Sequence, residues 1–134
     1  MSITCSLFPK FFQDLDPAGL AALTKECKLD TINAVVRDGY WIEQSNLAET
    51  CASFCDAMRA QDLNVFFATA ACLDPYDLIK DPAPLQTLWD NGITHVRVGY
   101  FSRNPKKPVA ETVADVKACV EQLSDVASKI GIKC

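Results

Sequence analysis

Three basic side chains stand in or directly after predicted apolar strands, where they can bind anions. Lys10 follows the first predicted strand, Arg37 ends the second, and Arg97 lies within the fourth. A guanidinium group in an apolar strand costs free energy unless it meets a carboxylate or a ligand anion. Asp38 is one candidate partner of Arg37, and a bound anion is the other. With Arg103, these cations predict a locally positive surface that suits a phosphorylated or carboxylated ligand.

The other side chains that could take part in chemistry, two cysteines and the single histidine, are predicted to have structural roles. Cys51 and Cys55 have the spacing of a helical metal pair, but Phe54 and Met58 share their predicted apolar face, which favours core packing. His95, the single histidine, opens the fourth predicted strand, at the end away from the expected ligand face. No glycine-rich phosphate loop follows a predicted strand, and no histidine is placed for a Ser-His-Asp arrangement.

The positions of these residues are set by a repeating pattern of strands and helices. Strand starts recur near residues 3, 32, 64, 95 and 132. A spacing of about 30 residues is typical of one βα unit in a parallel sheet. The predicted strands are short and apolar on both faces, as parallel strands are. They cover Ile3–Phe8, Ile32–Arg37, Val65–Ala70 and His95–Phe101.

Start signals and apolar periodicity predict four helices between these strands. Asp16-Pro17 and Asp81-Pro82 each combine a capping residue with a proline at the first helical position. Asn46 and Glu49 have the spacing of a capping box. The fourth helix carries apolar residues at intervals of three and four, and we expect this stripe to lie on the sheet. The stripe consists of Val109, Val113, Val116, Val120, Leu123 and Ile130.

Together these elements predict a single α/β domain over residues 1–134, with parallel strands in the order 1-2-3-4 and helices on the outer face. Two architectures fit. One is a flavodoxin-like sandwich; the other is a parallel (βα)4 half of a TIM (β/α)8 barrel that ends at the start of strand five. Links that follow the strands are long and rich in aromatic and charged residues. Both architectures place ligands at that end of the strands.

The composition of the chain argues against several classes of binding partner. A net charge of −4 and the lack of a long basic run argue against nucleic acid as a ligand. No apolar stretch has the length of a membrane span, and the start lacks the pattern of a signal peptide. The cysteines number seven and are spread over predicted strands and helices, which favours reduced thiols. We therefore expect a cytoplasmic protein that binds neither nucleic acid nor membranes.

The strand-end sequences resemble those of the sugar phosphate isomerase/epimerase branch of the xylose-isomerase-like TIM barrels. The resemblance runs in order over essentially the whole chain, and the same superfamily includes metal-dependent apurinic endonucleases. It rests on three segments: Ser6-Leu7-Phe8-Pro9-Lys10-Phe11-Phe12, Val35-Val36-Arg37-Asp38-Gly39-Tyr40 and Arg97-Val98-Gly99-Tyr100-Phe101.

This resemblance implies a barrel in which a divalent metal (Mn, Mg, Co or Zn) polarises a sugar carbonyl or hydroxyl while acidic residues move a proton. In such enzymes the metal ligands come from strands five to eight. The resemblance therefore implies no metal ligand in this chain and assigns no catalytic residue. The expected substrate-binding residues, which form the wall of the pocket, are Lys10, Arg37, Asp38, Arg97 and Tyr100.

The leading hypothesis is thus the amino-terminal half of a sugar or sugar-phosphate isomerase/epimerase, inactive alone. The alternative is a non-catalytic flavodoxin-like module that binds an anionic small molecule or associates with itself. A half-barrel has open, apolar strand edges, and such edges recruit partners. We therefore expect a homo-oligomer.

Overall fold

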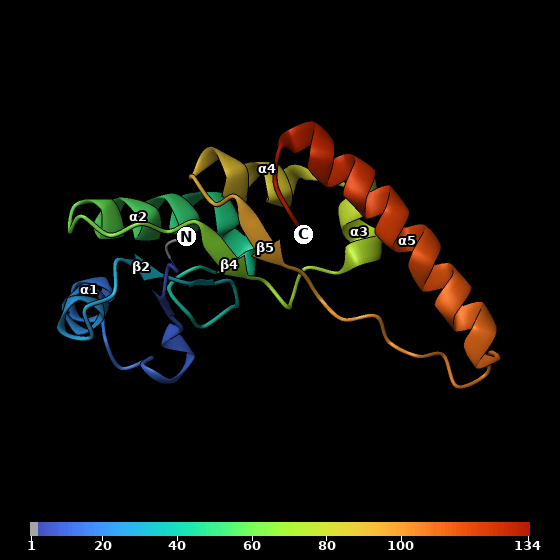
Figure 1. Cartoon of the computed structure of the whole chain (residues 1–134), viewed down its shortest axis with the longest axis horizontal. Coiled ribbons are helices and arrows are strands. Elements are labelled where there is room, and N and C mark those ends of the chain that lie inside the picture. Colours follow the sequence, from blue (N-terminus) through green and yellow to red (C-terminus); the bar gives the residue numbers. More distant parts are fainter. Residues whose placement is uncertain (1–2) are drawn as a thin grey trace.

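The computed structural model describes residues 3–134 as strands that alternate with helices (Figure 1). The strands are short, and α5 is the longest helix. In chain order the elements are β1 (Ser6–Leu7), η1 (Pro9–Phe11), α1 (Pro17–Glu26), β2 (Thr31–Ile32), β3 (Ala34–Val35), η2 (Gln44–Asn46), α2 (Leu47–Arg59), β4 (Phe67–Thr69), α3 (Pro75–Lys80), α4 (Ala83–Asp90), β5 (His95–Arg97) and α5 (Val109–Ile130).

All the strand pairs in the described part of the chain are parallel and follow the order of the sequence. β1 pairs with β2, β3 with β4, and β4 with β5. A parallel bridge between His95 and Lys133 adds the start of a further strand beside β5. The predicted α/β class and the order of the parallel strands are therefore confirmed. The strands do not close into a barrel.

The predicted second strand is interrupted, so β2 and β3 are two halves of one extended segment with Asn33 between them. The pairing explains the interruption. Thr31 pairs with Asn64, whereas Ala34 pairs with Ala68, so the neighbouring segment has one extra residue between these pairs. Such a bulge breaks the ladder and bends the strand. It also makes β4 shorter than the predicted range Val65–Ala70.

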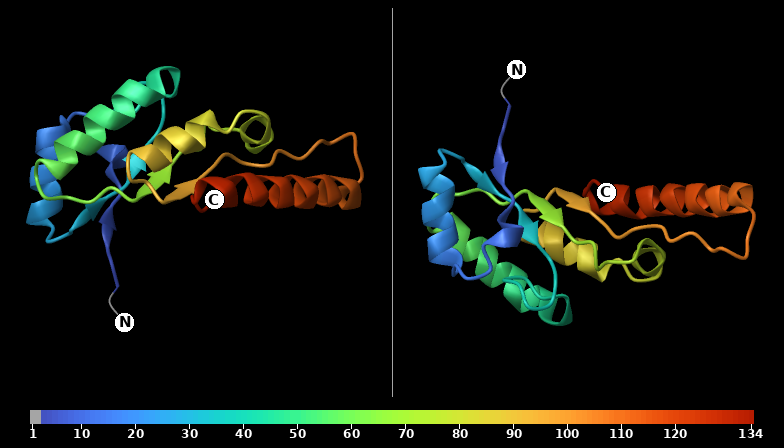
Figure 2. Two further views of the ribbon diagram at one scale, coloured as in Figure 1. Left: turned by 90° about the horizontal axis from the view of Figure 1, so that it is seen from above. Right: turned by 90° about the horizontal axis from the view of Figure 1, so that it is seen from below.

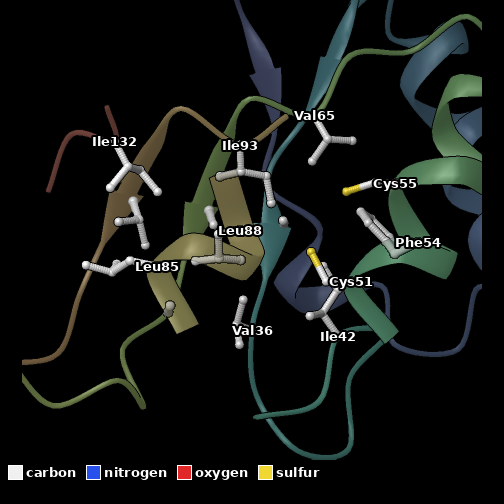
Figure 3. Close-up of a cluster of buried hydrophobic side chains, with 14 of the residues drawn as sticks. Val36, Ile42, Cys51, Phe54, Cys55, Val65, Leu85, Leu88, Ile93 and Ile132 are labelled. Carbon is white, nitrogen blue, oxygen red and sulfur yellow. The ribbon is translucent and has the colours of Figure 1, made fainter. Parts of the chain in front are cut away.

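The helices cover one face of the strands and enclose the hydrophobic core. Strand residues on that face are fully or almost fully buried: Ile32, Ala34, Val36, Ala68, Ala70, Val96 and Ile132. Figure 3 shows Cys51, Phe54 and Cys55 of α2 approaching Val36 and Val65 from the helix side, while Leu85 and Leu88 of α4 lie nearer Ile132. Full burial of the larger side chains among them, such as Leu85 and Leu88, contributes about 1.5–3 kcal/mol each.

One predicted helix start is confirmed, one lies a residue later than predicted, and one predicted capping pattern is wrong. The Asp16 carboxylate accepts a hydrogen bond from the Gly19 amide at 2.7 Å and caps α1. α4 begins at Ala83, so Pro82 is its N-cap and not its first residue; Asp81 accepts a bond from the Ala83 amide at 3.1 Å but is not the cap. At α2, however, Asn46 Nδ2 donates to Glu49 Oε2 at 2.9 Å and caps no backbone amide. The side-chain pair replaces the capping box.

One helix was not expected. α3 begins at Pro75, in the predicted link between the third strand and the following helix. Its start has the same chemistry as that of α1: Asp74 accepts hydrogen bonds from the amides of Tyr76 and Asp77, at 2.8 and 3.2 Å. The Asp-Pro signal was therefore present in the sequence. A helix of 6 residues is too short for apolar periodicity to reveal it.

The expectation that the whole apolar stripe of α5 lies on the sheet is wrong. Figures 1 and 2 show α5 projecting beyond the rest of the molecule, with its amino-terminal end far from the strands. Cys119, Leu123 and Ala127 are buried, but Val109 and Val113 are 57% and 47% exposed. The long segment 98–108 carries the start of the helix away from the sheet.

Among residues 3–134 no helix combines the length and apolar character that a membrane crossing needs.

Candidate functional site

A cleft of about 370 Å³ lies where the strands end, on the side of the sheet that the helices leave open. Its size is within the range of small-molecule sites. It draws residues from the segments that follow β1, β3, β4 and β5. The lining residues are Phe8, Lys10, Val35, Val36, Arg37, Tyr40, Thr69, Ala71, Cys72, Arg97 and Tyr100.

Arg97 enters the cleft because of its register in the sheet. Val35 pairs with Thr69, and Thr69 pairs with Arg97, so the three side chains form one row on one face. The neighbours in sequence, such as Val96, face the core instead. The Arg97 guanidinium donates a hydrogen bond to Tyr100 Oη and lies 4.7 Å from the centroid of that ring. Tyr100 is 70% exposed and forms the rim.

Arg37 is held by a turn at the end of the second extended segment. The Arg37 amide donates to the Ile42 carbonyl at 2.8 Å, and the Tyr40 amide donates to the Arg37 carbonyl at 3.0 Å. Gly39 permits this turn because its φ is +82°, which favours glycine. The Arg37 guanidinium lies 5.8 Å from the Tyr40 ring centroid. Tyr40 Oη donates to the Lys10 carbonyl at 3.5 Å, which joins two loops of the cleft.

Asp38 does not line the cleft and forms no ion pair with Arg37. Its Oδ1 accepts hydrogen bonds from the amide and the hydroxyl of Ser45, at 3.0 and 3.1 Å. The Ser45 amide, followed by the Ser45 hydroxyl, holds the pKa of the Asp38 carboxyl below its usual value. Asp38 thus fastens the loop that carries Tyr40. The described structure therefore has no ion pair between Arg37 and Asp38, which was one of the two alternatives for Arg37.

The cleft is positive although the chain is acidic overall. Lys10, Arg37 and Arg97 take part in none of the ion pairs of the described residues, and no carboxylate lines the cleft. Arg103, which was expected to add to this surface, is not among the lining residues. Cations without ion-pair partners in a concave site attract anions. Of the expected site residues, four therefore come together: Lys10, Arg37, Arg97 and Tyr100.

Sequence reasoning missed three polar residues of the lining. Tyr40 follows Arg37 by three residues, as Tyr100 follows Arg97, so the spacing was a usable signal. Thr69 and Cys72 carried no such signal, because only the pairing of β4 with its neighbours brings them to the cleft. The Cys72 thiol donates to the Val36 carbonyl at 3.1 Å. Burial raises the pKa of Cys72, with the Asp38 charge as a smaller cause, so the sulfur stays protonated.

The residues expected to be structural lie away from the cleft. Cys51 and Cys55 are 0% and 1% exposed in the core, as core packing requires. His95 faces Thr94, whose hydroxyl is 2.9 Å from His95 Nδ1, and it does not line the cleft. Within residues 3–134 no three His, Cys, Asp or Glu side chains gather as a metal site would require.

Asn33, next to β3, is the one buried side chain of the described residues whose oxygen has no hydrogen-bond partner. It is 9% exposed and lies two residues before Val35, which lines the cleft. A buried carbonyl oxygen without a donor costs about 1–3 kcal/mol.

Comparisons with known proteins identify no relative: no protein-family model matches the chain, and no curated protein matches it significantly. The resemblance of the strand-end segments to the sugar phosphate isomerases/epimerases therefore stays a hypothesis.

Proposed function

We propose that this chain is the (βα)4 amino-terminal half of a TIM barrel and forms the substrate-binding wall of a sugar or sugar-phosphate isomerase/epimerase. Sequential parallel strands with helices on their outer side support the half-barrel. The observation that carries the functional part is the meeting of Lys10, Arg37, Arg97 and Tyr100 in one cleft at the carboxyl ends of the strands.

The residues of this cleft are suited to binding a ligand rather than to catalysing a reaction. Hydroxyl groups of Thr69, Tyr40 and Tyr100 can hydrogen-bond a polyol, and the cations can hold an anionic group. The lining includes no carboxylate or imidazole, so it offers neither a ligand set for a divalent metal nor a general base of the usual kind. In the proposal, this chain orients the substrate, and the metal and the proton-transferring groups belong to other strands.

The test measures binding and turnover on the same preparation. Saturation-transfer NMR with fructose and fructose 6-phosphate reports binding, and an isomerase assay with added Mn²⁺ or Mg²⁺ reports turnover. We expect binding of at least one of these sugars and no turnover. Robust turnover would show that the chain carries its own metal ligands, contrary to the proposed division of roles. Absence of any sugar binding would overturn the proposal.

A second candidate, a non-catalytic module that binds small anions, is favoured by the lack of acid–base groups in the cleft. The two candidates differ in what they recognise. A sugar-binding wall discriminates between sugar isomers, whereas an anion module binds inorganic phosphate as tightly as any sugar phosphate. Competition of inorganic phosphate against fructose 6-phosphate therefore separates them.

A further inference from the structure

Two segments of the cleft share the pattern Val-Arg-x-Gly-Tyr: Val36–Tyr40 and Val96–Tyr100. One follows β3 and the other begins within β5, on the two sides of β4. In both, the valine is buried against the helices, at 1% and 3% exposure, and the arginine and the tyrosine line the cleft. In both, the guanidinium lies over the tyrosine ring of the same segment. The repeated pattern thus builds the same pair of side chains twice.

The sheet register offsets the two arginines along the strands. Arg97 lies in one row with Val35, and Arg37 follows Val35 by two residues. The two arginines therefore enter the cleft at positions two residues apart along the strand direction. A tyrosine ring beside each guanidinium restricts its orientation. Arg97 uses one N–H to bond Tyr100 Oη, and in the described residues its other N–H groups and those of Arg37 make no side-chain hydrogen bond, so they can bind a ligand. Planar N–H pairs match the oxygens of phosphate and carboxylate.

The charge of the cleft favours phosphate over carboxylate. Lys10 adds a third cation, and none of the three is paired with a carboxylate in the described structure. The three side chains are exposed and hydrated. A neutral sugar gains nothing from their charge, and a carboxylate supplies a single negative charge. A phosphate monoester carries about −1.5 to −2 charges at neutral pH and has three acceptor oxygens. It is the small group that best satisfies two guanidinium groups from opposite sides.

We infer that Arg37 and Arg97 form a two-armed clamp for the phosphate of a phosphorylated sugar, with Tyr40 and Tyr100 holding the guanidinium groups in place. The inference rests on the proposed function and deepens it, because it assigns the substrate to the phosphorylated class. Lys10 contributes long-range attraction from the first loop.

The experiment is isothermal titration of the whole chain with three probes at 150 mM salt: fructose, fructose 6-phosphate and inorganic phosphate. Arg37→Gln and Arg97→Gln each remove one arm. Arg103→Gln removes the same charge from a residue outside the cleft and is the matched control. Circular dichroism checks that each variant is folded. Arg97→Lys keeps the charge and removes the planar donor pair.

We expect fructose 6-phosphate to bind at least about ten-fold more tightly than fructose, because only the phosphate ester forms charge-assisted hydrogen bonds with the two guanidinium groups. Each glutamine variant should lose about ten-fold in affinity for the phosphate ester, Arg97→Lys should lose part of it, and Arg103→Gln should stay within about two-fold. The double variant that carries both Arg37→Gln and Arg97→Gln should bind fructose 6-phosphate no more tightly than fructose.

The outcomes separate this inference from the proposed function. Equal binding of fructose and fructose 6-phosphate, unaffected by the glutamine variants, overturns the clamp while the sugar-binding wall stands. Equal binding of inorganic phosphate and fructose 6-phosphate, both lost in the variants, supports the clamp but contradicts the sugar-binding wall. A loss in Arg103→Gln as large as in the cleft variants would reveal non-specific attraction and would overturn the clamp.

Discussion

The amide of Gly99 donates a hydrogen bond to the carbonyl oxygen of Leu73 over 2.8 Å, and this contact ties the segment after β5 to the loop after β4. A Cβ atom at position 99 would lie 2.7 Å from the same oxygen and 3.1 Å from the Ala71 carbonyl oxygen. Only glycine allows the two backbones to approach this closely. Because Arg97 and Tyr100 flank Gly99, the contact also positions one half of the cleft.

Replacement of Gly99 by alanine should therefore destabilise the protein. The obstacle is backbone rather than a flexible side chain, so we expect a loss of about 1–3 kcal/mol in the free energy of unfolding. Urea denaturation measures it. Gly19→Ala is the control, since its Cβ would meet only side-chain atoms, at 3.3 Å or more, and alanine favours the helix. Equal stability of Gly99→Ala and the parent chain would contradict the observed approach.

The bond between Asp38 and Ser45 should make stability depend on pH in the acidic range. The pKa of Asp38 is lowered in the folded state, so its contribution is complete above the unfolded pKa of about 3.9 and disappears as the pH falls through the folded value. The difference in Tm between the parent chain and Asp38→Asn should be largest at neutral pH and shrink below about pH 4. Asp125→Asn, which removes a charge from an exposed position of α5, controls for net charge. A difference that is the same at pH 7 and pH 2 would exclude this role.

The seven cysteines should react with iodoacetamide in an order set by burial. Cys5, Cys27 and Cys134 are exposed, but partial desolvation of the thiol raises the pKa of Cys134, so Cys5 and Cys27 should react first. Cys72 is half-buried, and burial raises its pKa and slows its reaction. The buried residues Cys51, Cys55 and Cys119 should react only when the chain unfolds. Peptide mass spectrometry at several times of reaction follows each site. Uniform rates in guanidinium chloride serve as the control, and early labelling of Cys51 would contradict the core packing of α2.

We expect the protein to associate with itself, because β5 is not covered beyond its bridge with Lys133. A groove of about 530 Å³ lies between α5, the segment that follows β5 and residues 132–134, and its apolar lining residues include Val98, Phe101 and Val120. Exposed apolar surface costs about 25 cal/mol per Å² relative to its burial. Multi-angle light scattering at micromolar concentration should report a dimer or a larger species.

A charge in the groove should weaken this association. Val120→Asp places a carboxylate in the groove, whereas Val109→Asp places one on an exposed part of α5 outside it. We expect the first variant to shift the mass toward the monomer and the second to have little effect. If the parent chain is a well-folded monomer with a cooperative melt, the open edge does not recruit a second copy.

The sequence alone determined the features that depend on neighbours within one element, and the order of the repeating units. Apolar spacing placed Cys51 and Cys55 inside the core, and the Asp16-Pro17 pair marked a helix start, because these features follow from interactions over a few residues. The recurrence of strands at about 30 residues predicted a parallel sheet in sequential order, because a helical crossover of that length returns the chain beside the preceding strand.

Tertiary structure decided what depends on residues distant in sequence. The bulge opposite Asn33 shortened the strands, and the segment after β5 turned the first half of α5 away from the sheet, so that Val109 and Val113 are exposed. The same applies to the cleft. Arg97 enters it through its row with Val35 and Thr69, while Asp38, equally polar and adjacent to Arg37, turns to Ser45 instead. The strand register and the contacts between loops decide which of several polar residues enters the cleft. These contacts join residues far apart in the sequence, so no local sequence pattern predicts the result.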